Sequence, residues 1–490
     1  MPFTAVFSLT YQPNDKSNQC LNVFTTEIFT PTSGEQDEET AMSTQYDEII
    51  VGAGIAGIVA GLLHVRQGKK VALVDSAESA GGLMRTYITP EGKHFDYGTH
   101  LLSELGIADL DKLLFECVRN DSWHEFDYLK SGHFIHKTLC ERSPVVDATI
   151  LKEADYLRAM VELVEATANP RDGYDTLSQQ LTKCFGDTLY QELLKPAVEK
   201  LFFASADDLA TNSHLLYGLA RVQGFSEQTT RILKQLPKLN DVLAFHSHKE
   251  GNGAIKRYYP KQGGIGQWVD HLLSQFCEHG GKLYLNCKIT GMSVHEQKVT
   301  SLHTDAGELY CQKLTWTIAP FMLLQSTNLH ALLPEFAANQ LNFLDSWLVH
   351  LEVDRAPLTS LHYYNNFDPQ YAHFRSTLYS NMQGETENGA HRVTVEAFSK
   401  HADTTQISAT DILQELIDCG VFPQESQLTY HHVDRISRSF PVPTVAFRQQ
   451  QQVQVNCIRE NLKNVSLYGK ARGDIFFMND VILDIYQSLT

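Results

Sequence analysis

The chain has 490 residues, of which 43% are hydrophobic and 20% are charged, and its formal net charge is −18. This composition is that of a globular protein long enough for two or three domains. Because binding a polyanion requires a basic surface that releases counterions, the negative charge disfavours nucleic acid or an acidic membrane as a partner. The nine cysteines are dispersed and form no Cys-x-x-Cys pair, which is typical of reduced thiols rather than of a disulfide framework.

Residues 1–44 differ in character from the rest of the chain. They contain few periodic apolar positions and end in an acidic run of small residues over 33–40, so we expect a disordered extension. Met42, directly before the first predicted strand, is a candidate natural start. Neither a signal sequence nor an apolar stretch long enough to span a bilayer is visible, so we expect a cytoplasmic protein without an integral membrane segment.

The elements that follow predict an α/β fold. Residues 48–51 and 70–74 are short apolar strands, and the helical spacing over 55–67 between them indicates a parallel βαβ unit. The stretch 148–222 is mostly helical, and strands at 282–285, 299–303 and 313–318 are expected to return to the first sheet. Between 347 and 398 the apolar period is two, which predicts a half-buried antiparallel sheet. A strand at 465–468 and a helix at 479–489 close the chain.

A glycine-rich turn joins the first strand to its helix and predicts a dinucleotide site. The turn reads Gly52-Ala53-Gly54-Ile55-Ala56-Gly57. The first glycine permits the tight turn, the second lets the backbone approach a pyrophosphate, and the third allows close packing of helix and strand. Asp75, at the end of the second strand and followed by Ser76, is placed to accept hydrogen bonds from a ribose. The motif alone does not separate NAD from FAD.

Two later segments resemble those of a known flavoprotein superfamily. The run Gly81-Gly82-Leu83-Met84-Arg85-Thr86 resembles the G-G-x-x-x-T segment of the FAD-binding amine oxidase and protoporphyrinogen oxidase superfamily. The run Gly98-Thr99-His100 resembles the segment that passes the flavin ring in that superfamily, and is similar to the G-x-H stretch of UDP-galactopyranose mutases. The resemblance implies FAD as the cofactor, with Arg85 near its phosphates or flavin and His100 beside its ring.

The resemblance continues in the second half of the chain. Residues 259–266 are similar to the superfamily's P-x-G-G entry to a helix, and Ile289 lies where the superfamily places an apolar residue against adenine. A segment near the C-terminus resembles the strand end and helix N-terminus that bind the pyrophosphate and the flavin edge. It differs from the usual pattern by a lysine in place of arginine and by one extra residue between the glycines. The residues that the resemblance assigns there are Gly469, Lys470, Asp474, Met478, Asn479 and Asp480.

The domain organisation implied by these matches is discontinuous. We expect a Rossmann-type FAD-binding domain from 45–120, 255–325 and 455–490. The substrate domain is then a mainly helical part, 121–254, and an antiparallel-sheet part, 326–454.

Substrate residues are predicted on weaker patterns. His100 is the candidate catalytic residue, since an imidazole beside the ring can tune the flavin or move a proton. Ser103 stands where the mutases have a second histidine. Arg435 and Arg438 precede a proline-bearing segment and are candidates to bind a carboxylate or diphosphate, and Tyr363 is a candidate pocket aromatic. No spacing typical of a metal site is present, so we expect no metal.

Three functions remain open on the sequence alone. The first is an FAD-dependent oxidoreductase that oxidises a small organic substrate at the flavin N5. The second is a non-redox sugar isomerase resembling UDP-galactopyranose mutase. The third is a non-catalytic FAD-binding interaction protein. The oligomeric state is left undetermined.

Overall fold

The computed structural model describes residues 45–245, 255–384, 386, 388–473 and 477–490. The predicted extension 1–44, with the candidate start Met42, lies outside the described residues, as does Asp474. Residues 43–490 form one compact unit.

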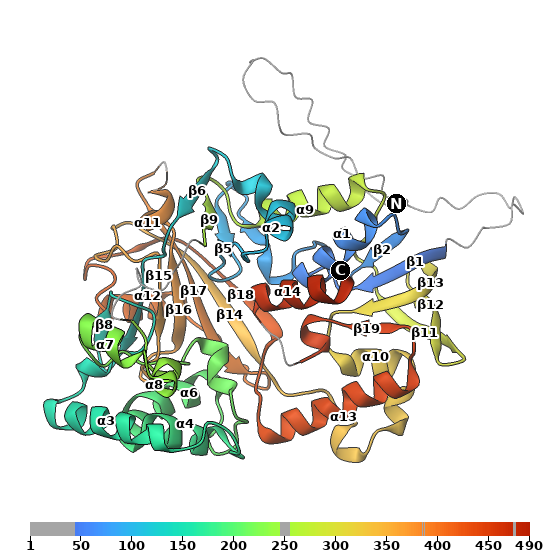
Figure 1. Ribbon diagram of the computed structural model, residues 1–490. Helices are drawn as coiled ribbons and strands as arrows, with labels where there is room; N and C mark the ends of the chain where they lie inside the picture. Colours follow the sequence, from blue (N-terminus) through green and yellow to red (C-terminus); the bar gives the residue numbers. More distant parts are fainter. Residues whose placement is uncertain (1–44, 246–254, 385, 387, 474–476) are drawn as a thin grey trace, which may run out of the picture. The chain divides into compact units, whose positions relative to one another are not determined.

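A seven-stranded sheet carries the predicted βαβ unit (Figure 1). The strands lie in the order β10-β2-β1-β13-β12-β11, and β19 also pairs with β13. Strands β10, β2, β1, β13 and β19 pair in parallel, whereas β12 and β11 continue the sheet antiparallel. The strands are β1 (Gln45–Val51), β2 (Val71–Val74), β10 (Lys282–Tyr284), β11 (Ile289–His295), β12 (Lys298–Thr304), β13 (Gly307–Trp316) and β19 (Val465–Leu467). The predicted α/β class with a Rossmann-type sheet is therefore confirmed.

Helices cover both faces of this sheet. Ile50 and Leu73 pack with α1, α9 and α14, whereas Ile49 and Val74 pack with α10 and α13 on the other face. Burial on both sides explains why residues 49–51 of β1 and 71–74 of β2 are continuous apolar runs. The helices are α1 (Ile55–Arg66), α9 (Gly266–Glu278), α10 (Pro320–Ser326), α13 (Val445–Asn461) and α14 (Met478–Leu489).

A second seven-stranded sheet has the order β18-β14-β17-β16-β15-β7-β8. Its pairs are antiparallel except for β15 with β7. Val349 and Leu351 pack against helix α12 (Ala409–Asp418), so His350 and Glu352 face the opposite side. The strands are β7 (Ser131–Ile135), β8 (Thr138–Cys140), β14 (Phe343–Val353), β15 (Tyr363–Asn366), β16 (His373–Leu378), β17 (His391–Lys400) and β18 (Leu428–Pro441).

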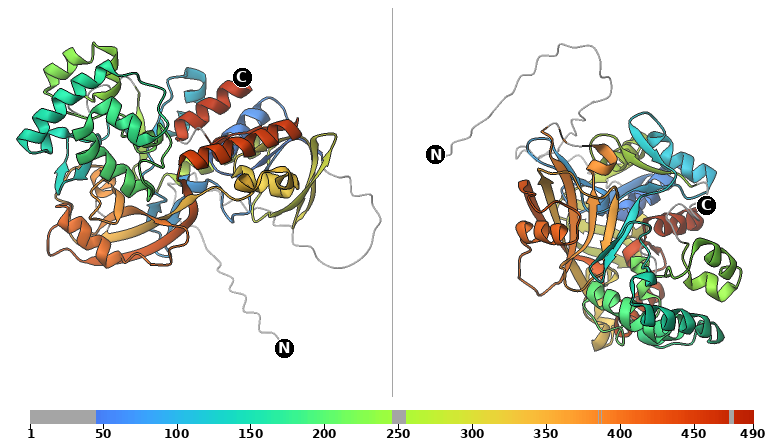
Figure 2. Two further views of the ribbon diagram at one scale, coloured as in Figure 1. Left: turned by 90° about the horizontal axis from the view of Figure 1, so that it is seen from below. Right: turned by 90° about the vertical axis from the view of Figure 1, so that its left-hand side faces the viewer.

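The segment 121–254 differs from the expected mainly helical structure at its start. It begins with three strands, two of which join the second sheet. The sequence did not predict these strands, because they are short and lack a clear period of two. Its helices gather beside the antiparallel sheet, where they are coloured green in Figure 2. These helices are α3 (Glu153–Glu165), α4 (Leu177–Phe185), α5 (Asp187–Leu189), α6 (Lys195–Phe202), α7 (Glu227–Leu233) and α8 (Pro237–Val242). The remaining elements are α2 (Ala108–Phe115), α11 (Ser380–Gln383), β3 (Thr86–Ile88), β4 (His94–Asp96), β5 (Leu102–Ser103), β6 (Trp123–Phe126) and β9 (Arg257–Pro260).

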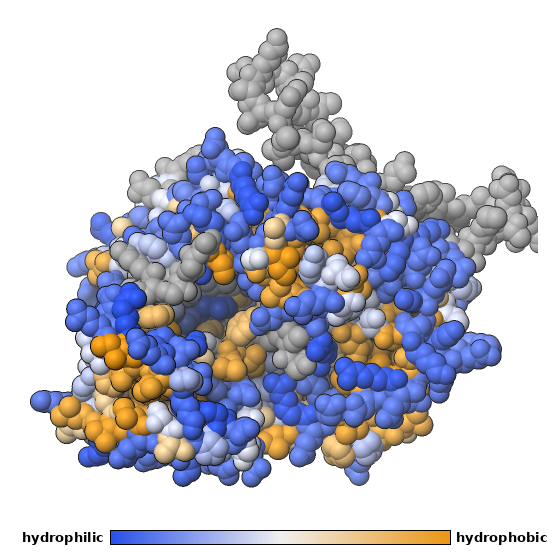
Figure 3. All heavy atoms as spheres, in the orientation of Figure 1, coloured by the Kyte–Doolittle hydropathy of each residue, from blue (hydrophilic) through white to orange (hydrophobic). Residues whose placement is uncertain are grey.

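Polar residues cover most of the face drawn in Figure 3, and apolar residues gather over α3 and α7. Among the described residues, no helix combines the length and apolar character that a membrane span requires. The exposed apolar side chains of α3 are Leu157, Val161 and Val164.

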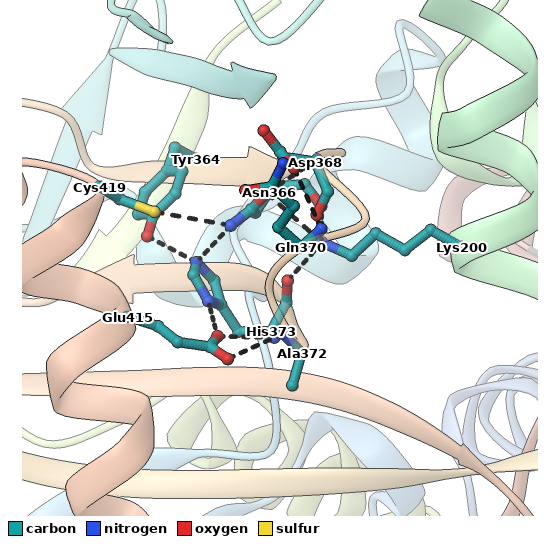
Figure 4. A network of polar contacts seen from close by, with 9 residues as sticks. All are labelled: Lys200, Tyr364, Asn366, Asp368, Gln370, Ala372, His373, Glu415 and Cys419. Carbon is teal, nitrogen blue, oxygen red and sulfur yellow. Dashed lines mark hydrogen bonds and ion pairs between the residues drawn. The ribbon is translucent and has the colours of Figure 1, made fainter. Parts of the chain in front are cut away.

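A buried polar network joins helix α6 to the second sheet (Figure 4). Lys200 Nζ donates hydrogen bonds to the backbone oxygens of Asn366, Asp368 and His373 at 2.8–2.9 Å. Burial lowers the pKa of Lys200 to about 7. The His373 imidazole, which is fully buried, donates to the Glu415 carboxylate of α12 at 2.5 Å. The network thus connects the helices of 153–202, the second sheet and α12.

We predict that Lys200→Met lowers the free energy of unfolding by about 2–4 kcal/mol, because three buried carbonyl groups lose their donor. Urea denaturation followed by circular dichroism measures this. Lys195→Met is the matched control on the same helix, since Lys195 makes no side-chain hydrogen bond to any described residue. Equal effects of the two substitutions would contradict the role given to Lys200.

Candidate functional site

The glycine turn between β1 and α1 contains two positions filled by protein and one that is open. A Cβ built on Gly52 would lie 2.3 Å from Thr317 Oγ1, and one built on Gly57 would lie 1.9 Å from the Gly52 oxygen. A Cβ on Gly54 would meet no protein atom within 4 Å. The first and third glycines are therefore required by packing. The second borders open space at the N-terminus of α1, where free N–H groups and the helix dipole favour an anion.

Asp75 is fixed beside this turn. Its Oδ2 accepts from the Ala53 N–H at 2.7 Å, and its Oδ1 accepts from the Ala77 N–H at 2.9 Å. Each carboxylate oxygen retains a lone pair that can accept from a hydroxyl. The backbone of Asp75 also accepts from the Cys287 N–H at 2.9 Å, which brings the segment before Ile289 to the same place. Ser76, next in the chain, is exposed.

The second glycine segment packs against the first. The Gly81 N–H donates to the Ala53 oxygen at 2.7 Å, and a Cβ on Gly82 would lie 3.3 Å from the Gly54 Cα. Leu83 and Met84 continue in a 3-10 turn, after which the guanidinium of Arg85 lies 4.4 Å from the Tyr97 ring centroid. Arg85 Nε is buried and has no hydrogen-bond partner among the described residues. A buried donor without a partner fits a bound anionic or polar group here.

The C-terminal segment approaches the same turn from the other side. A Cβ on Gly469 would lie 3.4 Å from the Ala56 Cβ, and α14, which starts at Met478, packs along α1. Lys470 is exposed, and partial desolvation of its ammonium lowers its pKa to about 8. Asn479 and Asp480 lie in the first turn of α14. The structure therefore brings Asp75, the second glycine segment and Gly469 to the first glycine turn.

The Gly98-Thr99-His100 run crosses from this region to the second sheet. Gly98 has a φ of +124°, and a Cβ there would lie 3.0 Å from Glu396 Cδ. The Thr99 N–H donates to Glu396 Oε1 at 2.9 Å. His100 Nε2 donates to the Tyr97 carbonyl at 3.2 Å, and desolvation lowers the pKa of His100 to about 4. His100 is therefore a neutral imidazole at ordinary pH.

An ion pair that the sequence analysis missed lies under this run. Arg375 of β16 and Glu396 of β17 are paired neighbours in the sheet and make two parallel hydrogen bonds of 2.7 Å each. Such bidentate pairs are the strongest arginine–carboxylate contacts. In the sequence, the pair is visible only as one charged residue in each of two segments of the predicted sheet. Periodicity does not show which residues of two strands lie opposite each other.

The structure places two of the three predicted substrate residues, Arg435 and Arg438, at Asp345 and the third, Tyr363, elsewhere. The Arg435 guanidinium pairs with Asp345 at 2.9 Å and stacks over the Trp347 ring, 5.0 Å from its centroid. Arg438 is exposed, and its backbone N–H donates to Asp345 at 2.7 Å. Asp345 is 1% exposed, and a buried carboxylate requires such partners.

Tyr363 instead lies on the face of the second sheet that carries the ion pair. It pairs with Thr377, which is two residues from Arg375 on the same strand face. Thr377 Oγ1 hydrogen-bonds Thr99 Oγ1. Tyr363 is thus the one predicted substrate residue that the structure places beside the His100 run.

Comparison with known proteins shows similarity to a family model and to curated relatives. Residues 50–113 match the model of the NAD(P)-binding Rossmann-like domain. The inactive all-trans-retinol 13,14-reductase of Danio rerio is 24% identical over 51% of this chain and 43% of its own length. The 4,4'-diapophytoene desaturase of a Methylomonas species is 26% identical over 50% of this chain and 48% of its own length. The chain therefore spans less than half the length of these curated relatives.

Solved structures resemble the chain over nearly its whole length. A reduced UDP-galactopyranose mutase has a TM-score of 0.70 at 15% identity, covering 91% of this chain and 94% of that one. A putrescine oxidase bound to putrescine has a TM-score of 0.57 at 14% identity, covering 91% and 98%. The chain therefore contains a segment that matches the NAD(P)-binding Rossmann-like domain, and it shares its fold with a UDP-galactopyranose mutase and a putrescine oxidase.

Proposed function

We propose that the protein is an FAD-dependent oxidoreductase that acts on a small organic substrate. The observation that carries the proposal is the open space at Gly54, which is bordered by the α1 N-terminus, Asp75 and the second glycine segment. Arg85 Nε, which has no hydrogen-bond partner among the described residues, is a further donor for the cofactor. When bound, FAD would supply the two-electron redox chemistry.

The chain's own residues would have distinct roles around the cofactor. Asp75 would hold the ribose, and the N–H groups at the start of α1 would hold the pyrophosphate. Lys470 and Arg85 would supply positive charge. His100, neutral and fixed by the Tyr97 carbonyl, would border the reacting face without adding charge.

A mutase-like sugar isomerase is the second candidate. The likeness to UDP-galactopyranose mutase and the Gly98-Thr99-His100 run favour it. Arg435, one of the two candidates to bind a carboxylate or diphosphate, instead pairs with Asp345, and the backbone of Arg438, the other candidate, donates to the same carboxylate. The names of the curated relatives, an inactive reductase and a desaturase, both refer to redox reactions. We therefore rank the oxidoreductase first.

We predict that Gly54→Val abolishes FAD retention but leaves the fold intact, because the new side chain would enter the open space, where its Cβ would meet no protein atom within 4 Å. Flavin absorbance after purification and thermal unfolding of the flavin-free proteins measure the two effects. Gly291→Val is the matched control on β11, where a Cβ also meets no atom closer than 3.5 Å. A yellow Gly54→Val protein with full flavin content would refute the site.

We predict that acidification weakens wild type more than His100→Asn. His100 has a folded-state pKa of about 4, below its unfolded value, so the unfolded chain takes up a proton first as the pH falls below about 6.5. Between pH 7 and pH 5 wild type should lose about 1–2 kcal/mol relative to the variant. Urea denaturation at both pH values, with both proteins in the same state of flavin loading, measures the difference. If the difference in unfolding free energy between wild type and His100→Asn is the same at pH 7 and pH 5, His100 is not held neutral in the folded protein.

If the protein is an oxidoreductase, we predict that a substrate will bleach the flavin absorption. Under anaerobic stopped-flow conditions, at least one compound among amines, porphyrinogens and polyenes should bleach the absorption band, and an electron acceptor should restore it. Free FAD with the same compound is the control. Failure of all compounds to bleach the band, with nucleotide-sugar binding only to chemically reduced protein, would instead support the isomerase.

A further inference from the structure

The ion pair between Arg375 and Glu396 leaves one guanidinium nitrogen without a hydrogen-bond partner among the described residues. Arg375 uses Nε and Nη2 to bind the carboxylate. Its remaining nitrogen, Nη1, makes no hydrogen bond to any residue that the structure describes, and the side chain keeps 28% of its surface exposed. Since a guanidinium has five N–H donors in a fixed plane, the pair holds an unused donor in a defined direction.

This donor borders the candidate reaction site. Glu396, which fixes Arg375, also accepts from the Thr99 N–H, and Gly98 lies against the same carboxylate. The charges of both pair members act on His100. Tyr363 shares the sheet face with Arg375. The Arg375–Glu396 pair therefore lies on the sheet face next to the Gly98-Thr99-His100 run.

The pair presents this donor without a net positive charge. The Glu396 side chain is 10% exposed, and although burial opposes its charge, Arg375 holds the pKa of Glu396 below the usual range. The positive charge of Arg375 is thus already balanced. An anionic ligand group would lose its hydration here without gaining a full counter-charge, whereas a neutral acceptor would lose much less.

We propose that the Arg375–Glu396 pair forms a substrate subsite in which Arg375 Nη1 binds the oxygen of an uncharged carbonyl or hydroxyl group. The proposal rests on the proposed function, because it assigns the substrate class of that same site. It excludes a carboxylate or diphosphate as the group held at this subsite.

Matched pairs of neutral and anionic compounds test the subsite. All-trans-retinol with all-trans-retinoate, and benzamide with benzoate, have similar bodies and differ in the charge of the end group. In titrations of the FAD-loaded protein followed by the flavin difference spectrum, we expect the neutral member to bind at least 10-fold tighter than its anionic partner.

The variant Glu396→Gln distinguishes this subsite from a structural ion pair. It keeps an acceptor for Arg375 and removes the balancing charge, so the preference should shift at least 10-fold toward the anionic members. Arg375→Lys keeps the ion pair but loses the forked donors, and should weaken neutral binding 5- to 10-fold. Arg392→Lys is the matched control, since Arg392 of β17 donates to the His94 oxygen and to Gln383, away from the pair.

Three results would overturn the proposal: tighter binding of the anions to wild type, an unchanged preference in Glu396→Gln, or no spectral response to any of the four compounds. These are separable from failure of the proposed function, which would appear as a protein that retains no FAD or whose flavin no substrate reduces. If Arg375→Lys does not fold, the proposal is still tested by two measurements. These are the preference of wild type for the neutral compounds and the shift of that preference in Glu396→Gln.

Discussion

The buried carboxylate of Asp96 connects the segments that form the site. Its Oδ1 accepts from Thr86 Oγ1 and from the Ile265 N–H, and its Oδ2 accepts from the Tyr259 hydroxyl, at 2.6–2.9 Å. Its backbone N–H donates to Tyr379 of the second sheet at 2.9 Å. Burial raises the pKa of Asp96 to about 6, so these donors must offset the cost of the charge. One side chain thereby aligns the second glycine segment, the run before His100 and the entry to α9.

The two halves of the site follow different physical rules. The cofactor half relies on backbone: close packing at Gly52 and Gly57, open space at Gly54, and N–H groups at the start of α1. The substrate half relies on side chains held by a rigid sheet, where Glu396 fixes both Arg375 and the Thr99 backbone. A sheet wall defines donor directions better than a loop does, because paired strands restrict the side chains that they carry. Specificity would then reside in the sheet, and cofactor binding in the turn.

The fold alone does not decide between oxidoreductase and isomerase, since one architecture hosts both a UDP-galactopyranose mutase and a putrescine oxidase. The charges of the site are more informative. Asp345 holds Arg435 and the backbone of Arg438, and Glu396 balances Arg375. A wall whose arginine is already paired suits an uncharged substrate group better than a diphosphate. This charge balance is the main physical argument for ranking redox chemistry on a neutral compound first.

The sequence by itself determined the βαβ unit with its glycine turn and Asp75, because each of these features is local. A buried strand, a glycine turn and a helix are adjacent in the chain, and Asp75 follows within one βαβ unit, so periodicity and spacing suffice to identify them. The strands at 131–140 were not predicted, because they are short and have no clear period of two. Their conformation depends on pairing within the second sheet. The Arg375–Glu396 pair, the position of Arg435 at Asp345 and the role of Asp96 depended on the tertiary structure. Their partners are far apart in sequence, and strand register, which decides which side chains meet, is set by the packing of the whole sheet.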